Sequence, residues 1–385
     1  MPGRHQQVNA RTPRGIGLRR FGTPLLAATS ALLLSACGAI DAVSGGDSSA
    51  SPKKGDDITV GLLLPDTDTA RFEKFDYPLI KKRVASLTHD KGKVSYANAG
   101  SSATRQARQF AQMISDRADV ILVDAVDSKS IAPQVQKAKD AGIPVIAYDR
   151  LAEGPIDGYV SHDNELVGEV QGRAIVDALG DKADTSKIVM MNGSVTDPNT
   201  ARFRQGALSE LKGRVVIAKS YYTKEWLPSE AEANMKKAIR SVGLDNIAAV
   251  YSANDGMAGA VIDALKSAGV AKMPPVTGQD ADLAAVQRVV AGEQRMSVYK
   301  SFLLEATGAA ELAVAKVQGK AIEFDALAQS SVDSPTEKSI PAQLVPVVAL
   351  TKDNIESTVI KDGVYSVEDI CTPKYADDCA AIGLE

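Results

Sequence analysis

Short runs of apolar residues alternate along this chain with longer stretches in which apolar residues recur every three or four positions. The short runs are nearly continuous in Val, Ile and Leu, which is typical of strands buried on both faces of a parallel sheet. We predict such strands at residues 58–64, 120–123, 144–148, 187–191, 215–218, 248–252 and 276–277. We predict amphipathic helices at residues 75–87, 104–117, 130–141, 166–179, 230–242, 257–267 and 281–291. This alternation predicts repeated βαβ units and therefore an α/β fold with doubly wound parallel sheets.

Polar and charged residues follow the carboxyl ends of the predicted strands. In open parallel sheets, ligands bind beyond these ends. The residues there include carboxylates, amides and guanidinium groups, which can hydrogen-bond a ring of hydroxyl groups, and aromatic planes that can cover the faces of a sugar ring. We therefore predict a site for a neutral sugar, not an anion. Its candidate residues are Arg71, Phe72, Asp149, Arg150, Asn199, Trp226, Asn254, Asp280 and Lys300.

Some of these residues also have purely structural interpretations. Asp197 and Asp255 can cap the helices that follow them, because an aspartate at an N-cap accepts hydrogen bonds from free backbone N–H groups. The adjacent Asp149 and Arg150 can form an ion pair beneath the site. The two aromatic candidates can be ordinary core residues. The sequence pattern alone leaves these alternatives open.

The sequence favours a binding protein over an enzyme. It contains no Gly-x-Ser-x-Gly elbow, phosphate-binding loop or histidine-based metal motif. A glycosidase needs one protonated carboxylic acid. Asp149 and Asp280 each have a basic residue close by in the sequence or the predicted site, which keeps a carboxylate ionised. We therefore expect no catalytic residue, no cofactor and no metal. The net charge of −4 also argues against a nucleic-acid partner.

The N-terminal region resembles an export signal. An arginine-rich start precedes an apolar segment, residues 25–34, that is too short to span a bilayer. Small residues then lead to Cys37. We predict a lipoprotein signal peptide at residues 1–36, acylation of Cys37 and a flexible tether at residues 37–57, which is rich in Gly, Ser, Ala and Asp. An ordinary cleaved signal and export by the twin-arginine route are the alternatives.

The chain has 385 residues and three cysteines. Its length is too great for one compact core and predicts two domains. With Cys37 acylated, Cys371 and Cys379 remain, and outside the cytoplasm such a pair is expected to form a disulfide. The alternative is a metal site, but no histidine lies nearby, and two thiolates do not complete the ligand shell of zinc.

Several motifs occur in an order that resembles the D-xylose-binding proteins of bacterial ABC sugar importers. The resemblance extends from about residue 58 to about residue 365. The motifs are AYDR at 147–150, SHDNELVG at 161–168, WLP at 226–228, AND at 253–255, TGQDADL at 277–283, SVYK at 297–300 and VIKDG at 359–363. Two positions depart from the family pattern: Phe72 stands where the family often has Trp, and Pro198 stands where Asn is expected.

The resemblance implies a type I periplasmic binding protein, in which two α/β lobes joined by three crossovers close on one sugar. By analogy the crossovers lie near residues 159–162, 297–299 and 344–347. The N-terminal lobe comprises residues 58–160 plus 299–344, and the C-terminal lobe residues 161–298 plus 345–385. The ligand contacts of the family fall on the same candidate residues that were identified above from their chemistry.

The resemblance also implies a function. We expect an extracytoplasmic monomer, anchored to the cell membrane by a lipid on Cys37, that captures a pentose, D-xylose, and delivers it to an ABC permease. The alternative is a lipoprotein of the same fold that senses a sugar and feeds a membrane receptor or kinase. A transcriptional regulator of this fold would need an N-terminal helix-turn-helix, and the export signal occupies that place.

Overall fold

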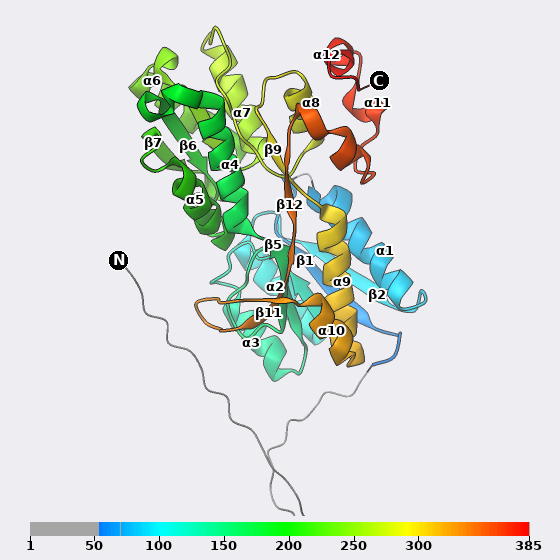
Figure 1. Cartoon of the computed structure of the whole chain (residues 1–385). Coiled ribbons are helices and arrows are strands. Elements are labelled where there is room, and N and C mark those ends of the chain that lie inside the picture. Colours follow the sequence, from blue (N-terminus) through cyan, green and yellow to red (C-terminus); the bar gives the residue numbers. More distant parts are fainter. Residues whose placement is uncertain (1–53, 70, 385) are drawn as a thin grey trace, which may run out of the picture. The chain divides into compact units, whose positions relative to one another are not determined.

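The structure is a computed structural model that describes residues 54–69 and 71–384. Within the described residues, its largest sheet has seven strands in the order β10-β11-β5-β4-β3-β1-β2. Strands β1, β2, β5 and β11 of this sheet are labelled in Figure 1. Neighbouring strands are parallel except β10 and β11. The strands are β1 (Thr59–Leu64), β2 (Lys93–Asn98), β3 (Val120–Val123), β4 (Val145–Tyr148), β5 (Gly158–His162), β10 (Ser330–Val332) and β11 (Ile340–Val345). We call this sheet and the helices packed on it the first lobe.

Helices cover both faces of the large sheet. Side chains alternate along β1, so that Val60 and Leu62 pack against one layer of helices and Leu63 packs with Phe110 of the other. The sheet is therefore doubly wound, as the sequence predicts. One layer consists of α1 (Tyr77–Leu87), α9 (Phe302–Gln318) and α10 (Ala321–Leu327), and the other of α2 (Ala103–Ser115) and α3 (Ala132–Asp140).

The second lobe is built on a smaller parallel sheet in the order β7-β6-β8. A separate antiparallel pair, β9 and β12, lies in the same lobe. The predicted strand at 276–277 is reduced to a bridge between Val250 and Val276. The strands are β6 (Lys187–Asn192), β7 (Val216–Tyr222), β8 (Ala249–Ser252), β9 (Ser297–Lys300) and β12 (Val347–Leu350). The helices are α4 (Asn164–Leu179) and α5 (Pro198–Leu211) on one face, α6 (Pro228–Val242) and α7 (Asp255–Ser267) on the other, and α8 (Leu283–Val290) beside β9.

Helices α4 and α5 cross closely because each has glycine at the crossing point. A Cβ on Gly168 would lie 1.9 Å from the carbonyl oxygen of Phe203, and a Cβ on Gly206 would lie 1.9 Å from that of Glu165. Any larger residue would push the helices apart. The crossing therefore fixes the position of α5, whose first turn carries Asn199 and whose next turn carries Phe203.

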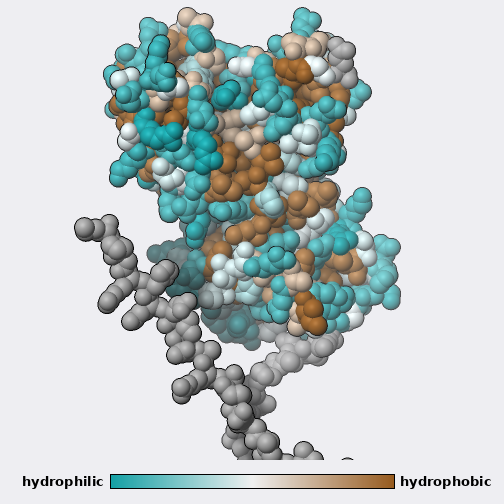
Figure 2. Space-filling model, viewed as in Figure 1, coloured by the Kyte–Doolittle hydropathy of each residue, from teal (hydrophilic) through white to brown (hydrophobic). Residues whose placement is uncertain are grey.

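The chain passes between the lobes three times: after β5, after β9 and between β11 and β12. These passages lie where the family resemblance implies. In Figure 2, hydrophobic residues gather on the surface where the two lobes meet. Leu303, Leu304 and Val348, which flank the passages, are 41–51% exposed. The predicted fold class, two α/β lobes joined by three crossovers, is confirmed. The residue boundaries that we gave to the lobes stay a prediction.

Some elements are not predicted by the sequence pattern. Strand β2 lies at the sheet edge and has mostly exposed or half-buried side chains, so it lacks the continuous apolar run of a central strand. Helix α9 is apolar around most of its circumference and therefore lacks a clear polar face. Strand β7 has the opposite discrepancy: the prediction of a buried strand is wrong, because β7 is an edge strand and is largely exposed.

The predicted signal peptide, Cys37 and most of the predicted tether lie outside the described residues. The last part of the tether, residues 54–57, contacts the first lobe. The backbone N–H of Lys54 donates to the carbonyl of Val317 at 3.0 Å. Gln318 Nε2 donates to the carbonyl of Gly55 at 3.2 Å. Within residues 54–69 and 71–384, no helix combines the length and apolar character needed to cross a membrane.

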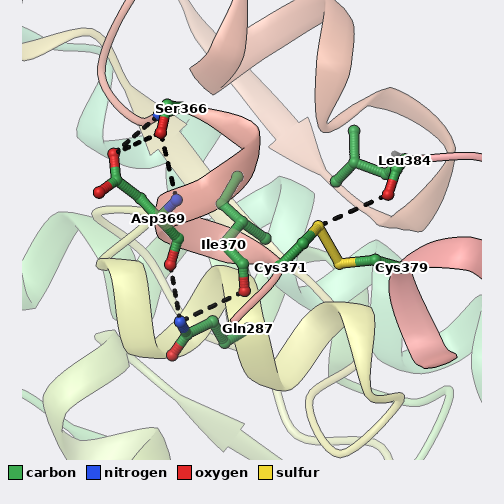
Figure 3. Close-up of a disulfide and its surroundings, with 7 residues drawn as sticks. All are labelled: Gln287, Ser366, Asp369, Ile370, Cys371, Cys379 and Leu384. Carbon is green, nitrogen blue, oxygen red and sulfur yellow. Dashed lines mark hydrogen bonds between the residues drawn. A yellow bond between two sulfur atoms is a disulfide. The ribbon is translucent and has the colours of Figure 1, made fainter. Parts of the chain in front are cut away.

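The C-terminal segment is held against α8 of the second lobe (Figure 3). Gln287 Nε2 on α8 donates to the carbonyl oxygens of Asp369 at 3.0 Å and Ile370 at 3.4 Å. A disulfide joins Cys371 to Cys379 and thereby connects α11 (Val367–Ile370) to α12 (Ala376–Ala381). The cross-link ties together a tail that would otherwise fray.

Replacing Cys371 and Cys379 together with serine is expected to loosen this tail without unfolding the lobes. The two cysteines are eight residues apart, and a loop of that length loses about 2–3 kcal/mol of stabilisation when its cross-link is removed. Hydrogen exchange measured by mass spectrometry should show faster exchange at residues 366–384 in the double variant, with α9 as the internal reference. Equal exchange in the oxidised protein and the variant would show that the disulfide does not form or does not stabilise the tail.

Candidate functional site

All nine predicted site residues line one cavity between the lobes. The space between their side chains, including the part that opens to solvent, is about 330 Å³. Each residue comes from a segment at or just beyond a strand end, as the topology of parallel sheets requires. Of the residues that the structure describes, four more line the same cavity: Thr69, Asp197, Phe203 and Gln279.

Arg71 enters the cavity from the π-helical turn after β1, and carboxylates fix its guanidinium group. Its Nε donates to Asp76 Oδ2 at 2.8 Å. Its Nη2 donates to Asp76 Oδ1 at 3.0 Å, to the Tyr148 hydroxyl at 3.2 Å and to Glu305 Oε2. Its Nη1 lies 3.6 Å from Asp149 Oδ2 and has no hydrogen-bond partner among the described residues. Nη1 is therefore the nitrogen of the Arg71 guanidinium group that remains without a hydrogen-bond acceptor in the described part of the chain.

Burial and charge act in opposite directions on the carboxylates behind Arg71. Burial raises the pKa of Asp76 to about 6, although the Arg71 guanidinium opposes this shift. Burial also opposes ionisation of Glu305, but Arg71 and His162 together hold the pKa of Glu305 well below its usual value. The His162 Nδ1 atom lies 3.4 Å from Glu305 Oε1. The cluster thus keeps Glu305 ionised and the Arg71 side chain in a single position.

Arg150 follows β4 and is surrounded by carboxylates of both lobes. Its Nε lies 2.9 Å from Asp197 Oδ2 and 3.4 Å from Asp124 Oδ1, and its Nη2 lies 3.5 Å from Asp66 Oδ2. Its Nη1 donates to the carbonyl of Ala125 at 3.3 Å. Burial disfavours the charged guanidinium, but these carboxylates keep the pKa of Arg150 above its usual value. The ion pairs of Arg150 are therefore with these three aspartates and not with the adjacent Asp149.

Asp149 and Asn199 connect the lobes directly. Asp149 has a left-handed backbone (φ 54°), and its carbonyl oxygen accepts hydrogen bonds from Tyr159 Oη and Ser161 Oγ, both at 2.8 Å, and from Asn199 Nδ2 at 3.0 Å. Asn199 Oδ1 accepts from Asn164 Nδ2 at 2.9 Å. Much of the hydrogen-bonding capacity of Asn199 is therefore used within the protein, while the Asp149 carboxylate faces the cavity beside Arg71.

Asp280 and Lys300 form the second charge pair of the site. Lys300 Nζ lies 3.0 Å from Asp280 Oδ1. Burial opposes the charge of Lys300, but Asp280 and Asp149 raise its pKa above the usual value. The turn that carries Asp280 has a left-handed backbone there (φ 92°). Asp255 holds this turn, since its Oδ2 accepts from the backbone N–H of Asp282 at 3.0 Å and from Ser297 Oγ at 2.7 Å.

The two capping alternatives have different outcomes. Asp197 caps α5, because its Oδ1 accepts from the backbone N–H of Asn199 at 2.8 Å. Asp255 does not cap α7. The N-cap of α7 is Asn254, whose Oδ1 accepts from the backbone N–H of Met257 at 3.0 Å. This bond uses the Oδ1 atom of Asn254 and does not involve its Nδ2 group.

The aromatic walls of the cavity are rigidly supported. Trp226 is 9% exposed, and its Nε1 donates to Asp197 Oδ2 at 3.1 Å. Phe203 packs edge-on to it, with ring centroids 6.3 Å apart. A Cβ on Gly193 would lie 2.0 Å from the Trp226 ring, so glycine is needed there. Phe72 is 1% exposed and packs in the core of the first lobe, while one side of it lines the cavity.

Phe203 and Asp197 are the main residues of the cavity that our site prediction lacks. Phe203 stands four positions after Asn199, a spacing that places two side chains on the same face of a helix and could have indicated it. Asp197 was visible in the sequence, but its charge partners lie on distant segments. Among the described residues, no group of three or more His, Cys, Asp and Glu side chains is arranged to hold a metal ion.

Comparisons with known proteins identify the family. Residues 60–321 match the family described as periplasmic binding protein domain. The D-xylose-binding periplasmic protein of Escherichia coli (strain K12) is 33% identical over 320 residues, which cover 82% of this chain and 93% of that protein. The multiple sugar-binding periplasmic receptor ChvE of Rhizobium radiobacter is 30% identical and covers 81% of this chain and 92% of its own length.

A solved structure agrees with these relatives. The ABC transporter solute-binding protein from Clostridium phytofermentans, with bound β-D-glucose, superposes with a TM-score of 0.74 and is 26% identical. The match covers 81% of this chain and 99% of that structure. These relatives bind substrates and are not enzymes. The chain therefore belongs to the periplasmic binding proteins that serve ABC sugar importers.

Proposed function

We propose that this protein binds D-xylose between its two lobes and delivers it to an ABC permease. The observation that carries the proposal is the charge balance of the cavity. Three cationic side chains line it, Arg71, Arg150 and Lys300, and three carboxylates do so as well, those of Asp149, Asp197 and Asp280. The charges of the lining side chains balance, so the site has no net attraction for an anion, and its donors and acceptors suit a neutral polyhydroxylated ligand.

The choice of D-xylose rests on the relatives together with the site. Two relatives of 33% and 34% identity are D-xylose-binding periplasmic proteins. The aromatic walls formed by Trp226 and Phe72 suit the apolar faces of a pyranose ring. Hexoses are the closest competitors, because a neighbour of the same fold holds β-D-glucose.

Lobe closure provides the mechanism. The first lobe contributes Arg71, Asp149 and Arg150, and the second lobe contributes Asn199 and Trp226. A sugar held by one lobe alone leaves hydroxyl groups unpaired, and closure pairs them. Ligand binding therefore shifts the population toward the closed form. We propose that the permease accepts this form.

Fluorescence of the single tryptophan tests the proposal directly. The purified protein is titrated with D-xylose, L-arabinose, D-ribose and D-glucose. We expect a saturable change with D-xylose at micromolar or lower concentration, and weaker responses to the other sugars. A response to another sugar alone would keep the class of protein and overturn the choice of xylose. No response to any of the four, with an unchanged melting temperature, would contradict sugar binding.

Replacing Asp280 with alanine is expected to weaken D-xylose binding by about 1–3 kcal/mol, because hydroxyl groups and Lys300 then lose a charged acceptor. Calorimetry of the variant measures the loss. Asp263→Ala is the matched control, since Asp263 is exposed on α7 of the same lobe and the change in charge is identical. Equal affinities for Asp280→Ala and the unmodified protein would remove Asp280 from the site.

We further propose that the protein acts outside the cytoplasm and is anchored by a lipid on Cys37. The names of its relatives support the location, since they are periplasmic proteins. The anchor rests on the sequence around Cys37 alone. Expressed in its host, the protein should be found in the membrane fraction, and Cys37→Ser should release it. An unchanged distribution would contradict the lipid anchor.

A further inference from the structure

A second cavity adjoins the sugar cavity between the same two lobes. It contains about 260 Å³ of space, including the part open to solvent. Pro65, Asp66, Ser101 and Val126 of the first lobe line it, as do residues of the second lobe, among them Thr196. It shares Arg150, Asp197 and Trp226 with the sugar cavity. Among the described residues, these three side chains border both spaces, and we call them the partition.

Asp197 holds the partition together. Its Oδ2 lies 2.9 Å from Arg150 Nε and accepts from Trp226 Nε1 at 3.1 Å. Arg150 belongs to the first lobe, and Asp197 and Trp226 to the second, so one carboxylate ties a side chain of each lobe into a continuous wall. All three residues are less than 10% exposed.

The other two members of the partition are also held by contacts of their own. The Trp226 ring lies against Gly193, where even a Cβ would clash, and against the edge of Phe203. Arg150 is also paired with Asp66 and Asp124. Asp197 is the smallest of the three side chains and contacts both of the others.

The second cavity is itself suited to a hydroxylated group. Ser194 Oγ and Thr196 Oγ1 lie 3.0 Å apart on its wall, and the Asp66 and Glu225 carboxylates contribute further acceptors. These hydroxyl and carboxylate groups are of the kind that pair with the hydroxyl groups of a sugar. A second sugar unit is therefore the kind of group that the cavity would receive once the partition opened.

We propose that Asp197 determines ligand length: it confines the protein to a single sugar ring and excludes β-1,4-linked disaccharides, whose second ring would occupy the adjoining cavity. This inference rests on the proposed function, because it takes the sugar cavity as the site of D-xylose. Asp197 acts here as a specificity-determining residue, through the wall that it forms with Arg150 and Trp226. The proposal does not require it to contact the sugar.

Asp197→Ser provides a sharp test. Serine can still accept the hydrogen bond from the backbone N–H of Asn199 and cap α5, but it is too short to hold Arg150 and Trp226. The measured quantity is the ratio of the Kd for xylobiose to the Kd for D-xylose, determined by calorimetry. Xylobiose presents one ring substituted at O1 and one substituted at O4, so the test does not depend on which end of the sugar faces the partition.

We expect the unmodified protein to bind D-xylose at least 100-fold more tightly than xylobiose. Asp197→Ser should lower this ratio at least tenfold. Thr196→Ala, which changes only the second cavity, should leave the ratio within about twofold. If Asp197→Ser does not fold, Trp226→Phe opens the partition from its other side and should also lower the ratio.

Some outcomes would overturn the inference. One is a ratio unchanged in Asp197→Ser, or in Trp226→Phe where that variant replaces it, while D-xylose still binds. Another is equally tight binding of xylobiose and D-xylose by the unmodified protein. Failure of the unmodified protein to bind D-xylose at all is a different result, because it would overturn the proposed function on which the inference depends.

Discussion

Replacing Arg71 with methionine is expected to lower the free energy of unfolding by about 3–5 kcal/mol, the usual cost of removing one partner from a buried ion pair. The side chains of Asp76 and Glu305 are both fully buried, and both form ion pairs with Arg71, whose guanidinium group donates hydrogen bonds to them. Without the guanidinium, either these carboxylates stay ionised in an apolar environment or they take up protons, and both are unfavourable. Urea unfolding at pH 7 measures the loss.

The control for this prediction is Arg83→Met. Arg83 also pairs with a glutamate, Glu311, but their side chains are 35% and 26% exposed, and such pairs contribute at most about 1 kcal/mol.

A second variant separates the effect on stability from the effect on sugar binding. Adding Glu305→Gln to Arg71→Met removes one unpaired charge and should restore part of the stability, whereas sugar binding should remain lost because the Nη1 donor is absent. Equal stability losses in Arg71→Met and Arg83→Met would contradict the importance of the buried cluster.

Replacing Trp226 with alanine is expected to weaken sugar binding by roughly 30-fold or more, a loss of about 2 kcal/mol that is typical of a buried aromatic anchor. Two effects contribute. The sugar loses the plane that covers one of its faces, and Asp197 loses the Nε1–H donor that helps to position it. Because the tryptophan signal is removed, calorimetry must replace fluorescence in this measurement.

Trp226→Phe distinguishes these two effects. Phenylalanine keeps an aromatic plane but cannot donate to Asp197, so its affinity for D-xylose should lie between those of the unmodified protein and Trp226→Ala. An affinity for D-xylose that is unchanged in Trp226→Ala would mean that Trp226 serves only the core of the second lobe, where it packs with Phe203 and other apolar residues. That result would restore the core-packing interpretation that the sequence leaves open.

The central strands of the first lobe could be predicted from the sequence because a strand that is buried on both faces consists of consecutive apolar residues. β1, β3 and β4 are runs of Val, Ile and Leu with few polar interruptions. β2 and β7 could not be predicted in the same way. Each is an edge strand, which buries less apolar surface and is held in place by hydrogen bonds to its one neighbouring strand. Helix α9 was not predicted because it is buried on several sides and therefore lacks the polar face by which an amphipathic helix is recognised.

The location of the site was also predictable, because polar residues after the strands of a parallel sheet converge at one edge whatever their distance in sequence. The partners of these residues were not. Arg71 and Glu305 are 234 positions apart in the sequence. Asp197 and Trp226, which form a hydrogen bond, are 29 positions apart. The sequence did indicate that Asp197 could cap a helix, since that bond is local, but it gave no sign that the second carboxylate oxygen closes a wall between two cavities.

The sequence by itself determined the α/β alternation, the candidate sugar-binding residues and the family, because each of these is encoded in local periodicity, strand-end positions or contiguous motifs. Only the tertiary structure decided which carboxylate neutralises which cation, how far apart the lobes hold them and where the adjoining cavity lies. The physical reason is that the chain crosses between lobes three times. The crossings bring together side chains that are far apart in the sequence, and their distances in space cannot be inferred from their separation along the chain.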